Sequence, residues 1–234
     1  MNAFSFFEKI YFINLEDRKD RLEKSLINFN NYEINNFERI DATKINKEDY
    51  PFLGEKERSQ LGCALSFYKV IKNAYNKNFN SILIFEDDFE FLHNKETTNL
   101  VLKKSIDNLP LDWDVLYLGA NIMYDYSSCP IEKFSENLFR INSAYCCHSI
   151  AFSKIAISKI IDIFPNESIF IEKINFYKAI DIFMAKEFCI KNSCFITSEM
   201  LCNQYASFSS IEDCNCDYSN ELIQRFENSK NNIC

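Results

Sequence analysis

The sequence predicts an α/β fold with a mostly parallel central sheet and helices on both of its faces. Short apolar runs alternate with longer segments in which apolar residues recur every three or four positions. The runs are continuously apolar, which is typical of strands covered on both faces. Strands that alternate with helices favour parallel pairing, because parallel neighbours need a crossover connection.

The individual elements follow from these two patterns. The run at residues 81–85 is the clearest central strand, and residues 59–78 are the clearest helix, with Leu61, Leu65 and Tyr68 on one apolar face. The other predicted strands are residues 10–15, 39–43, 115–118, 138–142 and 149–152. The other predicted helices are residues 18–29, capped by Asp17, and residues 97–109, 154–164 and 179–190. Residues 44–56 are polar and predict a loop.

Length and composition limit the class of protein. The 234 residues predict one domain, residues 1–234, with a polar peripheral tail from about residue 212. With 47% apolar and 26% charged residues, the composition is that of a soluble globular protein. The net charge of −8 argues against nucleic acid as a partner, since phosphate backbones attract basic surfaces.

No apolar run is long enough to span a membrane, and no targeting segment is recognisable. We therefore expect a cytoplasmic protein, with attachment to a membrane surface as the alternative. The ten cysteines include no Cys-x-x-Cys pair, which predicts reduced, mostly buried thiols and no zinc site. The alternative is disulfide bonding within a late cluster, namely Cys189, Cys194, Cys202, Cys214, Cys216 and Cys234.

Three consecutive carboxylates, Glu86, Asp87 and Asp88, follow the central strand. In open α/β sheets, ligands bind beyond the carboxyl ends of the strands. Glu86 and Asp88 should point to one side, where their charges repel unless a proton or cation neutralises them. A hard divalent ion with oxygen ligands fits this pattern, so Asp88 and Glu86 are the candidate metal ligands. Asp87 shapes the turn and joins the catalytic candidates. The alternative is an exposed acidic turn that only ends a strand.

Glycine is scarce, which bears on how a nucleotide would be held. Gly54, Gly62 and Gly119 build neither a GxGxxG fingerprint nor a P-loop. A metal ion that bridges a diphosphate to carboxylates is the natural substitute.

Arg18 and Arg21 follow the first strand and are three positions apart, so they can share a helix face. Such a pair can hold a diphosphate, and the alternative is a solvated helix start with local ion pairs. His148 is a lone histidine on a predicted strand, where a structural role is commoner than ligation.

Taken in order, several segments resemble glycosyltransferase family 25, which includes bacterial lipooligosaccharide galactosyltransferases and collagen galactosyltransferases. The resemblance begins after the first strand with Ile13-Asn14-Leu15 and Arg18-Lys19-Asp20-Arg21. It continues through Gly62-Cys63-Ala64-Leu65-Ser66, Glu86-Asp87-Asp88, Trp113-Asp114 with Leu118-Gly119, the block from His148 to Ser153, Asp181, and Gln204 with Ser209-Ser210-Ile211. Phe67 stands where the family has a histidine, and Ser149 and Ile150 depart from the family's block.

The resemblance implies a GT-A type fold and an inverting glycosyltransferase that uses a nucleotide diphosphate sugar, commonly with Mn²⁺ and alternatively with Mg²⁺. We expect UDP-galactose or UDP-glucose as the donor and a glycan or protein hydroxyl as the acceptor. The residues expected on the donor side are Asn14, Arg18, Arg21, Ser66, Glu86 and Asp88, with His148 and Gln204 as further candidates.

Asp181 is the candidate general base. An inverting transfer is a single displacement, so it needs a base opposite the leaving group, and a metal-bound carboxylate is a poor one. Asp181 lies in an otherwise apolar stretch, where partial desolvation would raise its pKa. The alternative is a helix N-cap, a position that Asp favours.

Two other classes of function compete with this interpretation. A phosphotransfer domain also carries paired acidic residues at strand ends, but on its first strand and in a chain about half as long. A degenerate transferase domain that binds a glycan or acts as a scaffold is the second, and Phe67 is the feature that favours it.

Overall fold

The computed structural model describes residues 2–124, 127–209 and 211–232. Its centre is an eight-stranded sheet with the order β2-β1-β3-β8-β5-β9-β7-β6. The strands are β1 (Lys9–Asn14), β2 (Phe37–Asp41), β3 (Ser81–Glu86), β5 (Val115–Ile122), β6 (Ile131–Lys133), β7 (Leu138–Ile141), β8 (Ala144–Ser153) and β9 (Cys194–Thr197).

Most strands of this sheet run in the same direction, as the sequence predicted. Strands β1, β2, β3, β5, β6 and β9 are co-directional, whereas β7 and β8 are reversed. Because β8 lies between β3 and β5, and β7 between β9 and β6, the sheet nevertheless contains antiparallel pairs. The α/β class is confirmed, and the reversed strands add detail that apolar runs could not reveal.

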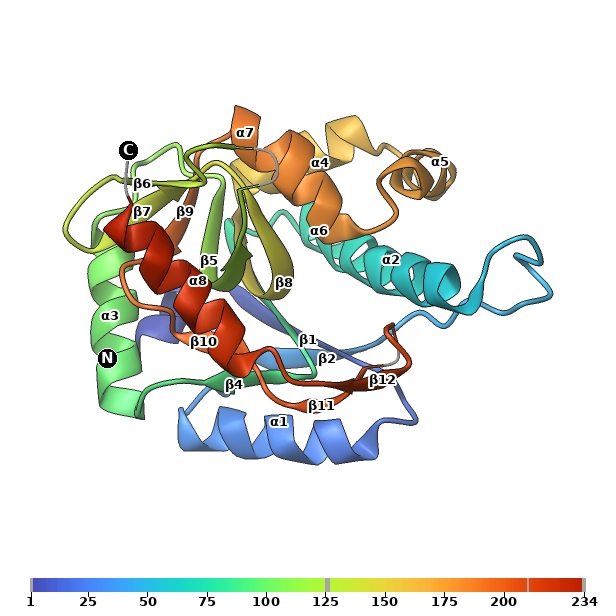
Figure 1. Cartoon of the computed structure of the whole chain (residues 1–234), viewed down its shortest axis with the longest axis horizontal. Coiled ribbons are helices and arrows are strands. Elements are labelled where there is room, and N and C mark those ends of the chain that lie inside the picture. The colour runs from blue at the N-terminus through green and yellow to red at the C-terminus, as the bar shows by residue number, and fades with distance from the viewer. Residues whose placement is uncertain (1, 125–126, 210, 233–234) are drawn as a thin grey trace.

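Helices cover both faces of the sheet (Figure 1). They are α1 (Lys19–Asn31), α2 (Glu55–Asn76), α3 (Lys95–Asp107), α4 (Lys154–Ile163), α5 (Glu167–Tyr177), α6 (Ile180–Phe183), α7 (Cys189–Lys191) and α8 (Ser219–Asn231). A 3₁₀ turn spans Ala3–Phe6, and a π-helical segment, Met184–Phe188, joins α6 to α7. The predicted helix over 179–190 therefore forms, although with a π-helical middle.

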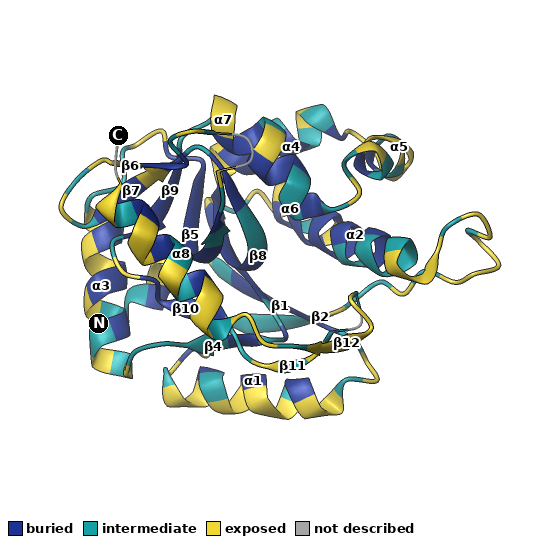
Figure 2. Cartoon of the chain, viewed as in Figure 1, coloured by how far each residue is buried: buried dark blue, intermediate teal, exposed yellow. Residues whose placement is uncertain are grey.

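Two hydrophobic clusters, one on each face, anchor the helices. Ile82 and Ile84 of β3 belong to the cluster under α2 and α4, whereas Leu83 and Phe85 belong to the one under α1 and α3. This alternation is what a strand buried on both faces requires. The central strands are accordingly buried, while the outer faces of α1 and α8 are exposed (Figure 2).

Two small antiparallel ribbons lie outside the main sheet. Strand β4 (Phe89–Phe91) pairs with β10 (Cys202–Gln204), and β11 (Ser207–Ser209) pairs with β12 (Cys214–Cys216). Because β4 begins directly after the acidic turn, its pairing with β10 brings the late part of the chain beside that turn. These short strands were not predicted, since three residues carry no periodic pattern.

Asp17 does not cap α1, which corrects the sequence prediction. Arg18 occupies the N-cap without a side-chain cap bond, and Asp17 instead accepts a bond from Lys44 Nζ at 3.0 Å. The expected polar tail contains α8, which lies on the surface but buries Leu222 and Phe226 in the core. The assignment of the whole chain to a single domain stays a prediction.

Eight of the described cysteines are free, including the described members of the late cluster, and Cys234 lies outside the described residues. Cys129 is disulfide-bonded, which corrects the expectation of uniformly reduced thiols. Within the described ranges, no helix has both the length and the apolar character needed to cross a membrane.

Candidate active site

A cavity of about 770 Å³ opens beside the carboxyl ends of β1 and β3. Its walls come from the start of α1, the loop after β2, the first turns of α2, the acidic turn and the β11–β12 ribbon. Of the sequence candidates, the cavity is lined by Arg18, Arg21, Glu86, Asp87 and Asp88. Parallel strand ends thus converge where such folds bind ligands.

Asp87 borders the cavity, but its carboxylate is held in a buried polar network. Arg21 donates to Asp87 Oδ1 at 2.6 Å, and Asn14 Nδ2 donates to Asp87 Oδ2 at 2.8 Å. Asn14 Oδ1 in turn accepts a bond from Arg39 Nε at 3.1 Å, which ties β2 to the network. Asp87 is only 8% exposed, so both oxygens are occupied by protein donors. Asp87 therefore fixes the shape of the turn.

The two arginines differ in what they offer a ligand. Arg21 is buried and also donates to Ser207 Oγ and the Phe208 carbonyl, both at 2.8 Å. Arg18 is partly exposed, makes two bonds to Asp20 and donates to the Phe208 carbonyl at 3.1 Å. Arg21 thus connects the acidic turn (residues 86–88) to the β11–β12 ribbon. The guanidinium of Arg18 is the more accessible of the two to a ligand.

Asp88 borders the cavity and, among the described residues, accepts only long hydrogen bonds from side chains. Arg21 Nη1 is 3.4 Å from Asp88 Oδ2, and Gln204 Nε2 is 3.4 Å from Oδ1 and 3.5 Å from Oδ2. Burial raises the pKa of Asp88, while the charge of Arg21 partly offsets this. The structure thus brings Gln204, a late residue of the sequence, to the carboxylate proposed as the main metal ligand.

Glu86 forms no ion pair with any of the described residues. The Cys63 thiol donates to Glu86 Oε1 across 4.0 Å. Burial, followed by the charges of Asp88 and Asp181, raises the pKa of Glu86 well above its usual value. The negative charges of Asp88 and Asp181 thus disfavour the ionised form of Glu86.

Asp181 lies in the first turn of α6 but is not its N-cap, because Ala179 occupies that position. The Cys146 amide donates to Asp181 Oδ2 at 3.3 Å, and the Ile182 amide donates to Oδ1 at 2.8 Å. Cys146 has a φ of +64°, a left-handed conformation that is costly for a non-glycine residue and turns its amide toward α6. Burial raises the pKa of Asp181 despite these donors.

Ser66 does not face the cavity but supports its wall. Its hydroxyl donates to the Gly62 carbonyl at 2.7 Å and accepts from the Thr43 amide at 2.8 Å. A Cβ on Gly62 would lie 2.3 Å from the Thr43 carbonyl oxygen, so only glycine allows this approach. The Gly62…Ser66 spacing therefore docks the loop after β2 against α2.

His148 is fully buried and is not among the residues that line the cavity. Its Nε2 lies 3.4 Å from the Cys202 carbonyl, and burial lowers the pKa of His148 to about 4. Gly119 packs so closely here that a Cβ would meet the same carbonyl at 2.0 Å. A neutral His148 supports β10, the strand that carries Gln204, rather than a ligand.

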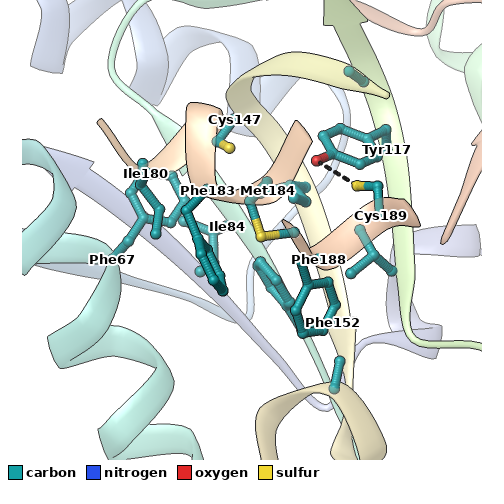
Figure 3. Packing of buried hydrophobic residues seen from close by; sticks show 14 of the residues in the cluster. Phe67, Ile84, Tyr117, Cys147, Phe152, Ile180, Phe183, Met184, Phe188 and Cys189 are labelled. Atoms are coloured by element: carbon teal, nitrogen blue, oxygen red, sulfur yellow. Dashed lines mark hydrogen bonds between the residues drawn. The ribbon is translucent and has the colours of Figure 1, made fainter. Parts of the chain in front are cut away.

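Phe67 also lies in the core and not in the cavity. It is 1% exposed and packs near Ile180 and Phe183, the residues that flank Asp181 (Figure 3). The residue that replaces the family's histidine therefore supports the helix start from which Asp181 projects.

The carboxylates fit a cation only in part. Among the described residues, no three His, Cys, Asp or Glu side chains form a metal-binding group. A hard cation would stabilise the ionised forms of these two carboxylates, whose pKa values are raised by burial and by the charges of neighbouring carboxylates. Such ions are often held by one or two carboxylates plus substrate phosphates, so Asp88 and Glu86 fit an ion that arrives with a diphosphate.

Sequence reasoning missed several residues at the site. The cavity wall includes Cys63, Arg58, Phe208 and the loop over residues 42–47. Cys63 stood inside the Gly62…Ser66 block, so that block was a usable signal. The position of Phe208 depends on pairing between β11 and β12, which no local pattern reports.

The chain matches the sequence profile of "Glycosyltransferase family 25 (LPS biosynthesis protein)" over residues 7–159. Human procollagen galactosyltransferase 2 is 29% identical over 133 residues, which is 50% of this chain and 21% of that protein. Human inactive glycosyltransferase 25 family member 3 is 26% identical over 129 residues, 48% of this chain and 22% of that protein. The chain thus spans about a fifth of the length of these relatives.

Among solved structures, mannose-1-phosphate geranyltransferase from Thermus thermophilus aligns with a TM-score of 0.44 and 9% identity. The alignment covers 81% of this chain and 72% of that structure. At this level the similarity carries no argument about residues or chemistry.

Proposed function

We propose that this chain, which belongs to glycosyltransferase family 25, transfers a hexose from a UDP-sugar to a hydroxyl group of a glycan or protein. The observation that supports this best is the pair Glu86 and Asp88 beside a cavity of about 770 Å³. Buried carboxylates whose pKa values are raised by burial and by neighbouring acidic residues cost folding stability, and such groups cluster where chemistry needs them. Galactose and glucose are the proposed sugars.

The donor would lie with its diphosphate at Asp88 and Glu86. A divalent ion held there, Mn²⁺ or alternatively Mg²⁺, would neutralise charge on the departing nucleoside diphosphate, a contribution of several kcal/mol. Arg18, the more available of the two arginines on the cavity wall, would assist the diphosphate. Asn14, Arg21 and Asp87 hold the acidic turn in place, so their contribution to donor binding is to position Asp88.

Asp181 would accept the proton of the acceptor hydroxyl. Its two amide donors orient the carboxylate, and its raised pKa increases its basicity toward the value that suits a general base. In an inverting displacement the acceptor oxygen attacks the anomeric carbon as the bond to the diphosphate breaks. Asp181 is separate from Asp88 in the chain and would serve the opposite face of the sugar.

A panel of nucleotide sugars tests this proposal. We expect the protein to release UDP from one UDP-hexose, and to do so only with a divalent ion present. Asp88→Asn should abolish the release, whereas Asp107→Asn, an exposed carboxylate on α3 paired with Lys103, should leave it unchanged. Release that persists at the wild-type rate in the Asp88→Asn protein would contradict the proposal.

The second candidate is a non-catalytic glycan-binding or scaffold domain. The buried Phe67, and the existence of a relative whose name describes it as inactive, favour it. It predicts that the protein binds UDP or a glycan but releases no UDP from any sugar in the panel.

A further inference from the structure

The β11–β12 ribbon carries two thiols side by side. Cys214 and Cys216 are two positions apart on β12, so their side chains share one face of the strand. Their Sγ atoms lie 3.6 Å apart, and the Tyr218 hydroxyl donates to Cys216 Sγ at 3.6 Å. Cys214 is exposed and Cys216 partly exposed, whereas Cys147, Cys189, Cys194 and Cys202 are buried.

The same ribbon forms one wall of the cavity. The carbonyl of Phe208, at the middle of β11, accepts bonds from both Arg18 and Arg21. Phe208 pairs with Asn215, the residue between the two cysteines. Beyond β11, Lys56 at the start of α2 bonds to Glu212 at 2.7 Å. The two thiols therefore flank the residue that pairs with Phe208, whose carbonyl positions both arginines.

We propose that Cys214 and Cys216 are an oxidative modification site, at which a low-molecular-weight disulfide converts them to a Cys214–Cys216 disulfide that loosens this cavity wall. One thiolate attacks a sulfur of the small disulfide, and a mixed disulfide forms as one small thiol leaves. The second cysteine thiolate then attacks the protein sulfur of the mixed disulfide and releases the second small thiol. Two electrons pass to the small disulfide, and the two cysteine protons end on the two small thiols.

Strand geometry explains why the disulfide would disturb the wall. Residues i and i+2 of an extended strand are separated by roughly 6.6 Å along the strand. The Cα atoms of a disulfide are usually about 4.4–6.8 Å apart and most often about 5.5–6 Å. A disulfide at the commonest spacing shortens and bends β12, which disturbs the pairing of Ser207 with Cys216 and of Ser209 with Cys214. The carbonyl of Phe208 would move with β11 and weaken its bonds to the two arginines.

The chemistry is tested on the full chain with oxidised glutathione. Peptide mapping by mass spectrometry should find a Cys214–Cys216 link, with loss of two hydrogen atoms. Hydrogen exchange of peptides that cover β11 and the start of α1 should accelerate on oxidation and recover with dithiothreitol. The matched control is the Cys214→Ser/Cys216→Ser double variant, which keeps Cys129 and the other cysteines and should show no oxidation-dependent change. Absence of the link, or a link with unchanged exchange, overturns the inference.

The effect on the donor rests on the proposed function and is measured separately. Calorimetry with UDP and Mn²⁺ should show roughly tenfold weaker binding to the oxidised protein, because contacts that place two charged donors are lost. Equal affinity for the oxidised and reduced proteins would overturn the effect on the cavity. If neither form binds UDP, the proposed function fails, while mapping and exchange still decide whether the thiol site exists.

Discussion

The acidic turn divides into two regions that are adjacent in sequence and opposite in electrostatics. Asp87 faces α1 and the end of β1, where Arg21 and Asn14 occupy both of its oxygens. Glu86 and Asp88 face the cavity, where burial and the charges of neighbouring carboxylates raise their pKa values. The interactions of Asp87 stabilise the fold. The burial of Glu86 and Asp88 costs folding stability, and the fold tolerates this cost because Asp87 is well paired. The two regions should therefore respond in opposite ways to the loss of a carboxylate.

The largest effect on stability is expected from Asp87→Ala. It leaves the Arg21 guanidinium buried without its closest partner, since both side chains are about nine-tenths buried. Breaking a buried pair in this way typically costs about 3–5 kcal/mol. Urea unfolding should show this loss, whereas Asp20→Ala, at a largely exposed carboxylate, should change stability by less than about 1 kcal/mol. A loss in Asp87→Ala as small as that of the control would remove the distinction between the regions.

Asp181→Asn should slow transfer by roughly 10²–10⁴-fold, the usual range for loss of a general base. Asn keeps an oxygen that can accept from the Cys146 or Ile182 amide, so the fold and the affinity for UDP should persist. Single-turnover rates and UDP binding are compared in the same preparations. A variant that binds UDP and transfers at the wild-type rate would show that the base lies elsewhere.

His148 should make the protein less stable in mild acid. Its pKa is lowered from 6.5 to about 4, so the folded state resists a proton that the unfolded state accepts. The stability that neutral His148 contributes is fully present above pH 6.5 and is lost as pH falls toward 4. The loss amounts to about 2 kcal/mol by pH 5. Urea unfolding of wild type and His148→Gln at pH 7 and pH 5 measures the part of this pH dependence that comes from His148. An equal pH dependence in both proteins would contradict the assignment.

Glu86→Gln should have a smaller effect of opposite sign. The raised pKa means that ionisation of Glu86 costs folding stability as pH rises above its unfolded value of about 4.5. Gln removes that cost, so the variant should be more stable than wild type at pH 8, with the difference shrinking toward pH 4. Thermal unfolding across this range measures it. A variant less stable than wild type at pH 8 would show that the ionised Glu86 stabilises the folded protein, which contradicts the prediction.

Sequence patterns predicted the main strands and helices of this fold better than the roles of the residues at the candidate site. Residues 81–85 form the central strand because a continuous apolar run has few alternatives. The loop after β2 and the helix α2 also lie where the polar and periodic segments predicted. Strands β4 and β10–β12 were missed because each is three residues long and exists through pairing with a distant segment.

Roles at the site depended on contacts that no pattern contains. Arg21 was expected to bind the donor, yet the fold directs its guanidinium to Asp87 and the Phe208 carbonyl. Asp181 was expected to be either a base or an N-cap, and the cap lies at Ala179. The left-handed backbone of Cys146, which directs an amide to Asp181, has no signature in the residue type.

UDP binding measured by calorimetry, with and without Mn²⁺, tests the central claim most directly. Wild type should bind UDP more tightly when Mn²⁺ is present, and Asp88→Asn should lose this dependence while its unfolding curve matches or exceeds that of wild type. That result would show that Asp88 serves a metal–diphosphate site and not the fold. Binding of UDP by Asp88→Asn with an undiminished Mn²⁺ dependence would contradict the account.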